Sequence, residues 1–525
     1  MVWKIMEKIF IVLILFGLLF FNSCVPPSQR IEGEKLKSES AEKQFTWALN
    51  NFYAAQYDDA IREFSKLIED YPESTLKADA QYMIGRCYFE KGQYLEVIYQ
   101  LKLFVSNFPD HIRAKEANRY ILEAQRKIQD TTTSQEQPLL PPTKKESQVV
   151  EKLPTDSRIK AAQILLFNCK NLDEVESEII NMRRAGVDTI IVRVFQNQGD
   201  RAFRFISPQA STGVYFKTSR APVVADILDP ITRIAHQYGV RVFAWMTTRY
   251  CDWLTTQRPE LKGYEYNLET KQPQQSRGLN IFHPVVQAYL IGLYKDLARY
   301  KIDGILFQDD LILRQTEGIS READEIYFRE FGKHIRFQAL FQNSYLGKDG
   351  KHYLSSNDYS DEFWNWVKWK NSQLLNLAHK IMKASKSENP GLKVALNLYY
   401  ETVLQPENAL AWLSQDIVRA KSYGFDYYSM MAYHRQIQKE LGVSSSRVLQ
   451  LIGEITRKMV ALLGNPESVL MKVQTIDWDT LDPVSDEELI SVFNTILGEG
   501  NVSLAYVPHN HRLLGTVINQ IYKSE

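Results

Sequence analysis

Two adjacent acids, Asp309 and Asp310, follow a short apolar run at residues 304–307. A continuous apolar run is typical of a buried parallel strand, and the loops that follow such strands build the active site of a β/α barrel. A carboxyl group at this position can protonate the leaving oxygen of a glycosidic bond. The alternative is a strand that ends in a solvated Asp-Asp turn.

The alternation of side chains along a strand predicts that only one of these acids points inward. Two sets of residues share a face: Leu306, Gln308 and Asp310 on one side, and Ile305, Phe307 and Asp309 on the other. Chitinase-type barrels carry Asp-Gly-x-Asp-x-Asp-x-Glu here, and matching that opening to Asp303-Gly304 places Asp310 on the catalytic acid. We therefore predict that Asp310 donates the proton, that Asp309 orients or tunes it, and that Asp310→Asn abolishes hydrolysis without unfolding the protein.

Eight β-like runs alternate with amphipathic helical segments in the last part of the chain. This alternation predicts a (β/α)8 TIM-like barrel over residues 159–525. A doubly wound open sheet is the alternative, but no Gly-rich phosphate loop supports nucleotide binding. The predicted strands are Ala161–Phe167, Thr189–Phe195, Arg241–Met246, Gly304–Phe307, Lys393–Leu398, Tyr427–Ala432, Val469–Gln474 and Val502–Tyr506.

An internal repeat precedes the barrel at residues 41–128. Tyr71-Pro72 and Phe108-Pro109 each close a helical pattern, and the two prolines give a period of 37 residues. Apolar residues every three or four positions resemble tetratricopeptide repeats, which stack as helix pairs. We expect these repeats to dock another envelope protein, with a short structural arm as the alternative. Residues 129–158 are polar and Pro-containing, which predicts a disordered linker.

The N-terminus resembles a bacterial lipoprotein signal. Lys4 and Lys8 precede an apolar run that ends in Asn22-Ser23-Cys24. We expect residues 1–23 to be removed and Cys24 to carry lipid, with residues 24–40 as a tether. The absence of Asp directly after Cys24 favours sorting of the lipoprotein to the outer membrane. The alternative to cleavage is that residues 1–23 stay as an uncleaved membrane anchor.

Composition excludes some function classes and leaves others open. Lys plus Arg and Asp plus Glu number 63 each, so the formal charge of zero gives no electrostatic case for nucleic acid. Cys87, Cys169 and Cys251 are too far apart in sequence to suggest a zinc site or a disulfide framework. We expect no metal and no cofactor.

Several segments together resemble the C-terminal hydrolase domain of the PgaB family of poly-β-1,6-N-acetylglucosamine deacetylases. They are Asn171-Leu172-Asp173, Gly213-Val214-Tyr215-Phe216, Val242-Phe243-Ala244-Trp245-Met246, Asn280-Ile281-Phe282-His283-Pro284, Asp303–Asp310, Asn397-Leu398-Tyr399 and Gln474-Thr475-Ile476-Asp477-Trp478. The resemblance implies an endo-acting hydrolase of partially deacetylated poly-N-acetylglucosamine, linked to export or biofilm turnover. The second catalytic role stays open: Asp309 orients or tunes Asp310, or the substrate's own N-acetyl group acts as the nucleophile, which needs no second carboxylate.

This chain departs from the family in ways that bear on its activity. The helical repeats stand where the deacetylase domain usually precedes the barrel, so we expect no deacetylase activity. Gln308 stands where the family tends to have His, and the family tends to have Pro and an acid near the positions of Ala432 and Arg435. The loss of that acid puts recognition of free glucosamine amines in doubt, so the polymer can differ.

Aromatic and polar residues near the strand ends are candidates for substrate contact, because flat rings stack on sugar faces. For each ring alone, core packing is the competing interpretation. The candidates are Trp245, Phe307, Asn397, Tyr399, Tyr433, His434, Trp478 and Tyr506. Two functional alternatives remain open: a barrel that only binds and guides a polysaccharide, and a chitin- or peptidoglycan-like amino-sugar hydrolase without an export role.

Overall fold

The computed structural model describes residues 40–52, 56–133, 153–154, 157–347, 352–354 and 359–523. The chain divides into two compact units, Met1–Glu146 and Ser147–Glu525. Cys24, the predicted signal, most of the predicted tether and residues 134–152 of the predicted linker lie outside the described residues. In the part that the structure describes, no helix has the length and apolar character needed to cross a membrane.

The first unit is helical, which confirms the predicted repeats. Its helices pack in sequence around one apolar core. Gly85 allows a close approach between two of them, because a Cβ there would meet Leu101 Cδ2 at 2.3 Å. The helices are residues 40–52, α3 (Tyr57–Asp70), α4 (Lys77–Glu90), α5 (Tyr94–Asn107) and α6 (Ala114–Thr133).

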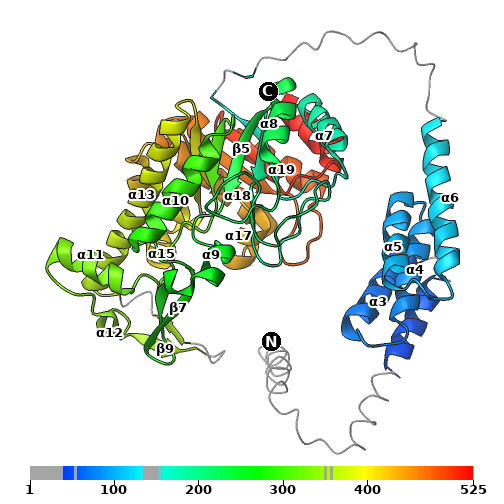
Figure 1. The fold of residues 1–525 in the computed structure, drawn as a ribbon, viewed down its shortest axis with the longest axis horizontal. Coiled ribbons are helices and arrows are strands. Elements are labelled where there is room, and N and C mark those ends of the chain that lie inside the picture. Colours follow the sequence, from blue (N-terminus) through cyan, green and yellow to red (C-terminus); the bar gives the residue numbers. More distant parts are fainter. Residues whose placement is uncertain are drawn as a thin grey trace, which may run out of the picture. The chain divides into compact units, whose positions relative to one another are not determined.

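In the described part of the second unit, parallel strands close into the predicted barrel (Figure 1). Each strand pairs with the next along the chain, and β14 pairs with β1, so no edge is left open. Four observed strands have the predicted bounds, and the others differ by one to three residues at an end. The barrel strands are β1 (Lys160–Ile164), β2 (Thr189–Arg193), β5 (Arg241–Met246), β8 (Gly304–Phe307), β11 (Lys393–Leu398), β12 (Tyr427–Met431), β13 (Val469–Gln474) and β14 (Ser503–Val507).

Helices surround the barrel and bury its outer face (Figure 1). Several begin at a side-chain cap: Asn171, Ser360, Ser444 and Ser485 each accept a hydrogen bond from a backbone N–H in the first turn. Such a cap contributes about 1 kcal/mol to helix stability. The larger helices are α7 (Leu172–Arg184), α8 (Leu228–Gln237), α10 (Pro284–Ala298), α13 (Asp361–Glu388), α18 (Ser445–Leu463) and α19 (Asp486–Leu497).

Shorter elements follow the carboxyl ends of the strands, where they enlarge that end of the barrel. They include three hairpins, β3–β4 (Phe195–Gln196 and Gly213–Val214), β6–β7 (Lys262–Asn267 and Gln272–Leu279) and β9–β10 (Ser344–Leu346 and His352–Leu354), in the described residues. The helices there are α9 (Asp252–Gln257), α11 (Arg321–Phe331), α12 (Phe337–Leu340), α14 (Glu401–Leu404), α15 (Pro406–Leu413), α16 (Ile417–Lys421) and α17 (His434–Leu441), and α20 (Asn519–Lys523) ends the described chain.

The inside of the barrel has two layers of different chemistry. An apolar layer fills its middle. In seven of the eight strands, the residue two positions after the apolar one lies on the same inward face. These side chains are polar or amphipathic and form an upper layer. The apolar layer includes Ala161, Ile191, Phe243, Leu306, Ala395, Tyr427 and Leu470, and the corresponding upper layer is Gln163, Arg193, Trp245, Gln308, Asn397, Ser429 and Lys472.

Candidate active site

The backbone turns directly after β8, and this turn separates the two acids. The strand ends at Phe307, and the Gln308 N–H still donates to the carbonyl oxygen of Met246 at 2.9 Å. Asp309 and Asp310 lie in the turn that follows. Because the extended backbone stops before them, strand alternation does not decide which acid faces the barrel axis.

Asp310 is anchored to the segment that follows β5. Its carboxylate accepts hydrogen bonds from the backbone N–H groups of Arg249 and Tyr250, both at 2.7 Å, and from Thr247 Oγ1 at 2.6 Å. Thr248 adds its N–H at 3.0 Å and its hydroxyl at 2.7 Å. With 1% of its surface exposed and five donor groups around its oxygens, Asp310 has no lone pair left for an incoming ligand.

A buried ion pair holds the loop after Asp310 in place. Arg249 Nη2 lies 2.6 Å from Glu317 Oε1, and both side chains are almost wholly buried. Burial alone would raise the pKa of Glu317, but Arg249 outweighs it and lowers the pKa to about 2. Lys370 adds hydrogen bonds to the carbonyl oxygens of Arg314 and Glu317 at 2.9 and 3.0 Å. These contacts fix the backbone that carries both acids.

Asp309 lies in a different environment, on the wall of a cavity of about 380 Å³. Burial raises the pKa of its carboxyl group above the ordinary value, the positive charge of Lys472 opposes that rise, and Asp310 adds to it. A carboxyl group whose pKa is raised is better suited to act as a general acid than one with the ordinary value. The cavity is lined by Leu165, Arg193, Phe195, Asn197, Gln198, Asp200, Trp245, Tyr250, Arg277, Gln308, Asp309, Asp310, Ile312, Arg314 and Tyr399.

The upper polar layer of the barrel carries hydrogen-bonding atoms without partners in the described residues. Burying such an atom unpaired costs about 1–3 kcal/mol, so a cluster of them requires an explanation. Three of the side chains, Arg193, Trp245 and Gln308, also line the Asp309 cavity. The atoms are Gln163 Oε1, Arg193 Nε, Trp245 Nε1, Gln308 Oε1, Asn397 Oδ1 and Ser429 Oγ.

Lys472 completes this layer from β13. It is 1% exposed, and it forms no ion pair with any described residue. Burial lowers the pKa of its ammonium group to about 8, although the charge on Asp309 raises it. Its Nζ lies 5.9 Å from the ring centroid of Tyr433. Among the described residues, Asp309 is the only charged group that shifts the pKa of this interior lysine.

Several predicted substrate-contact residues are placed around this site. Trp245 and Tyr399 line the cavity, and the Tyr399 hydroxyl lies 3.5 Å from the Asp309 carbonyl oxygen. Tyr433 packs against Trp478 with ring centroids 5.5 Å apart. All four rings are partly exposed. Asn397 is deeper, in the unpartnered polar layer, so these residues remain candidates for substrate contact.

Two of the predicted contacts require correction. The Phe307 ring is fully buried on the outer face of the barrel, between the strands and the helices. Its centroid lies 5.5 Å from that of Tyr294. Tyr506 is also fully buried, and its hydroxyl lies 2.9 Å from His509 Nδ1. Both side chains point toward the surrounding helices because strand alternation places them opposite the inward residues. They pack the core and do not reach the cavity.

His434 lies beside a separate cavity of about 740 Å³. Its Nε2 is 2.7 Å from Glu488 Oε1, and Arg435 donates to the same carboxylate at 2.8 and 2.9 Å. Arg435 and His434 lower the pKa of Glu488 to about 2. His434 is therefore part of an ion-paired network with Arg435 and Glu488 at the start of α17, and it does not line the Asp309 cavity.

Lys472 and Arg193 are the residues of the site that sequence reasoning missed. Each occupies an inward position near the carboxyl end of a strand, where the positions before it are apolar. A long cationic side chain at that place in a barrel strand is costly unless it serves the site above it. A cationic residue within an otherwise apolar strand was therefore the sequence feature that could have identified Lys472 and Arg193 as site residues.

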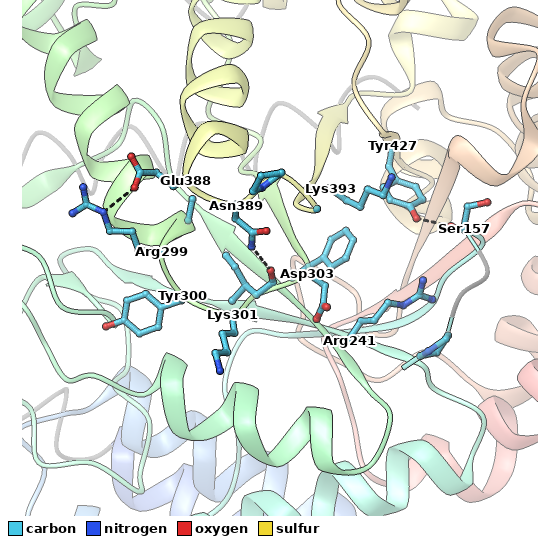
Figure 2. Close-up of a pocket in the computed structure, with 16 residues that line it drawn as sticks. Ser157, Arg241, Arg299, Tyr300, Lys301, Asp303, Glu388, Asn389, Lys393 and Tyr427 are labelled. Carbon is cyan, nitrogen blue, oxygen red and sulfur yellow. Dashed lines mark hydrogen bonds and ion pairs between the residues drawn. The ribbon is translucent and has the colours of Figure 1, made fainter. Parts of the chain in front are cut away.

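The amino-terminal end of the barrel holds another charged cavity, of about 640 Å³. Figure 2 shows its lining, in which Arg299 pairs with Glu388 and Asn389 donates to a backbone carbonyl oxygen. Asp303 Oδ2 accepts from the Val242 N–H at 2.7 Å and lies 2.8 Å from His236 Nε2. Polar groups at this end of a barrel serve its stability.

Comparisons with known proteins agree with this geometry. A family model described as hypothetical glycosyl hydrolase family 13 matches residues 169–507, and a tetratricopeptide repeat model matches residues 44–74 and 79–111. The PgaB (BpsB) glycoside hydrolase domain from Bordetella bronchiseptica has a similar structure, with a TM-score of 0.54 and 20% sequence identity over 70% of this chain and 98% of that chain.

The catalytic domain of a β-amylase from Paenibacillus polymyxa also matches, with a TM-score of 0.45 and 10% identity over 70% of this chain and 99% of that chain. No curated protein matches the chain. The predicted resemblance to the PgaB hydrolase domain is confirmed, and at this level of identity it shows a shared fold.

Proposed function

Since this chain belongs to the hypothetical glycosyl hydrolase family 13, we propose that its barrel cleaves glycosidic bonds within an amino-sugar exopolysaccharide. The substrate is partially deacetylated poly-β-1,6-N-acetylglucosamine, and the reaction serves its export or biofilm turnover. Lipid on Cys24 tethers the protein to the outer membrane, facing the periplasm, and the helical repeats dock it to an export protein. The barrel carries no deacetylase activity.

Within this proposal, the two acids exchange the roles that the sequence suggests. Asp309 protonates the glycosidic oxygen as the bond between that oxygen and the anomeric carbon breaks. Asp310 positions the segment 247–250 and the turn that bears Asp309. Both acids line the cavity. The observation that carries this assignment is the contrast between Asp309, which is partly exposed and has a raised pKa, and Asp310, which is buried and accepts hydrogen bonds from five donor groups.

The second chemical role falls to the substrate. Asp310 is engaged, and Asp200, which also lines the cavity, lies 3.5 Å from Arg193 Nη1 and accepts from the Asn197 N–H at 2.9 Å. No unpaired second carboxylate of the described residues therefore lines this cavity. The carbonyl oxygen of the substrate's acetamido group attacks the anomeric carbon in its place, and water then opens the resulting ring.

The test is mass spectrometry of the products formed by the full chain, extracted in mild detergent, from partially deacetylated poly-β-1,6-N-acetylglucosamine. Fully acetylated polymer and β-1,4-linked chitin oligosaccharides are the comparison substrates, and Asp309→Asn is the inactive control. We expect short oligosaccharides from the wild-type protein with the two β-1,6-linked polymers and none with the β-1,4-linked oligosaccharides. Cleavage of the β-1,4 oligosaccharides instead would assign the protein to chitin-like substrates.

A polysaccharide guide without turnover is the second candidate. The absence of an available second carboxylate in the described cavity favours it, because the unpartnered polar layer can bind sugar hydroxyls whether or not a bond is cleaved. Polymer that is bound by the wild-type protein but yields no product under any condition would select this function.

A further inference from the structure

A second cavity adjoins the Asp309 cavity on the same end of the barrel. Its volume is about 890 Å³, and it shares Arg314 and Tyr399 with the Asp309 cavity. A ligand that extends past Tyr399 therefore passes from one cavity into the other. Its wall includes the carboxyl groups of Glu265, Glu401 and Glu440 and the aromatic rings of Tyr345, Tyr353 and Trp412.

Exposed aromatic rings form much of the wall of this second cavity. Tyr345 and Tyr353 come from the β9–β10 hairpin and are 53% and 42% exposed, and Trp412 from α15 is 39% exposed. The two tyrosine rings lie with centroids 6.0 Å apart. Large rings left open to solvent around a cavity are suited to stacking on the flat faces of sugar rings.

Glu401 supplies a hydrogen-bond acceptor on the same wall. Its Oε2 is buried without a partner among the described residues, and burial raises its pKa to about 7. The neighbouring carboxylates differ, because Glu265 accepts from Gln274 Nε2 and Glu440 accepts from Gln436 Nε2, both at 2.8 Å. Among the described residues, Glu401 is therefore the carboxyl group in this cavity that has a buried oxygen without a partner.

We propose that the second cavity is a distal subsite that binds a further sugar unit of the same polymer chain whose scissile bond lies at Asp309. The sugar ring stacks on Trp412, and a hydroxyl or amino group of that unit donates a hydrogen bond to Glu401. This inference rests on the proposed function, and it makes the protein selective for long chains, since a short oligosaccharide fills the Asp309 cavity alone.

The test compares the full-chain variants Trp412→Ala and Glu401→Gln on substrates of two lengths. On the long polymer we expect kcat/KM to fall about tenfold for Trp412→Ala and about fivefold for Glu401→Gln, the size expected for one stacked ring and one hydrogen bond. On the shortest oligosaccharide that the wild-type protein cleaves, both variants keep wild-type kcat/KM. Glu407→Gln is the matched control, because Glu407 is exposed nearby in α15 and does not line the cavity.

Equal losses on both lengths, or no loss on either, would overturn the distal subsite. If the wild-type protein cleaves no polymer, the proposed hydrolysis fails, and affinity electrophoresis in gels that contain the polymer then tests the subsite separately. Retardation of the wild-type protein that Trp412→Ala weakens and Glu407→Gln keeps would support it. Equal mobility of all these proteins, with and without polymer, would contradict it.

Discussion

Both ends of the barrel hold cavities lined by charged side chains, but their polar atoms are satisfied differently. At the amino-terminal end, Asp303, Glu388 and Lys393 all have partners. At the carboxyl end, six buried polar atoms in the upper layer have none in the described residues. The paired charges at the amino-terminal end contribute to the stability of the fold. The unpartnered polar atoms, more than charge or volume, therefore distinguish the carboxyl end as the candidate ligand-binding end of the barrel.

The strongest test of this comparison is Asp309→Asn. The amide cannot protonate a leaving oxygen, so we expect kcat on the polymer to fall by about 10²- to 10⁴-fold, the usual contribution of a general acid. The free energy of unfolding stays near the wild-type value, because fewer donor groups bind this carboxyl than the five that bind Asp310. Steady-state kinetics and urea unfolding measure the two quantities.

Asp310→Asn is the matched control, and it has the same change of atoms. Its amide would face backbone N–H groups with another donor, so we expect the free energy of unfolding to fall by about 2–4 kcal/mol. If Asp310→Asn instead abolished hydrolysis in a fully stable protein while Asp309→Asn kept its activity, Asp310 would be the proton donor, as the sequence pattern suggests.

Glu317→Gln tests whether paired charges at the carboxyl end serve folding as they do at the other end. The pKa of Glu317 is about 2 in the folded protein and 4.5 in its reference state. Its ionised form therefore contributes stability above pH 4.5 that is lost as the pH falls toward 2. Removing the charge leaves Arg249 buried and unpaired, so we expect a loss of about 3–5 kcal/mol at pH 7.

Urea unfolding at pH 7 and pH 3 measures this loss and its decrease in acid. The exposed pair of Arg321 and Glu325 provides the control, because Glu325→Gln should barely change stability at either pH. A Glu317→Gln protein as stable as the wild type at pH 7 would show that the buried pair does not support the loop.

Asp303→Asn tests the amino-terminal cavity itself. The variant keeps one oxygen for the Val242 N–H but loses the charge that faces His236. We expect the free energy of unfolding to fall by about 1–2 kcal/mol with kcat unchanged. A tenfold loss of kcat without a loss of stability would show that this cavity, too, takes part in function and would break the comparison.

The sequence predicted the barrel well because its strands are continuous apolar runs, and buried parallel strands need little else. It also located the acidic turn. Strand alternation could not show how the two acids are held, because the period of two ends where β8 ends at Phe307. Which acid donates the proton therefore stays a prediction. The donors around Asp310 come from residues 247–250, about 60 positions away in sequence, and only the fold brings them together. Phe307 and Tyr506 were misassigned because nearness to a strand end does not reveal which face a ring occupies.

Lys472→Met has the smallest expected effect and tests how the polar layer acts on Asp309. The ammonium charge of Lys472 lowers the pKa of Asp309, so its removal raises that pKa. Hydrolysis needs Asp309 protonated, and the alkaline limb of the pH–rate profile should therefore move to higher pH. Stability should hold or rise, since an unpaired buried charge is replaced by an apolar chain of similar length. Lys393→Met, at the other end of the barrel and paired with Asp426 at 3.3 Å, should leave the limb in place. A limb that moves equally in both variants, or in neither, would mean that Lys472 does not tune the acid, and the unpartnered layer would then act on the substrate alone.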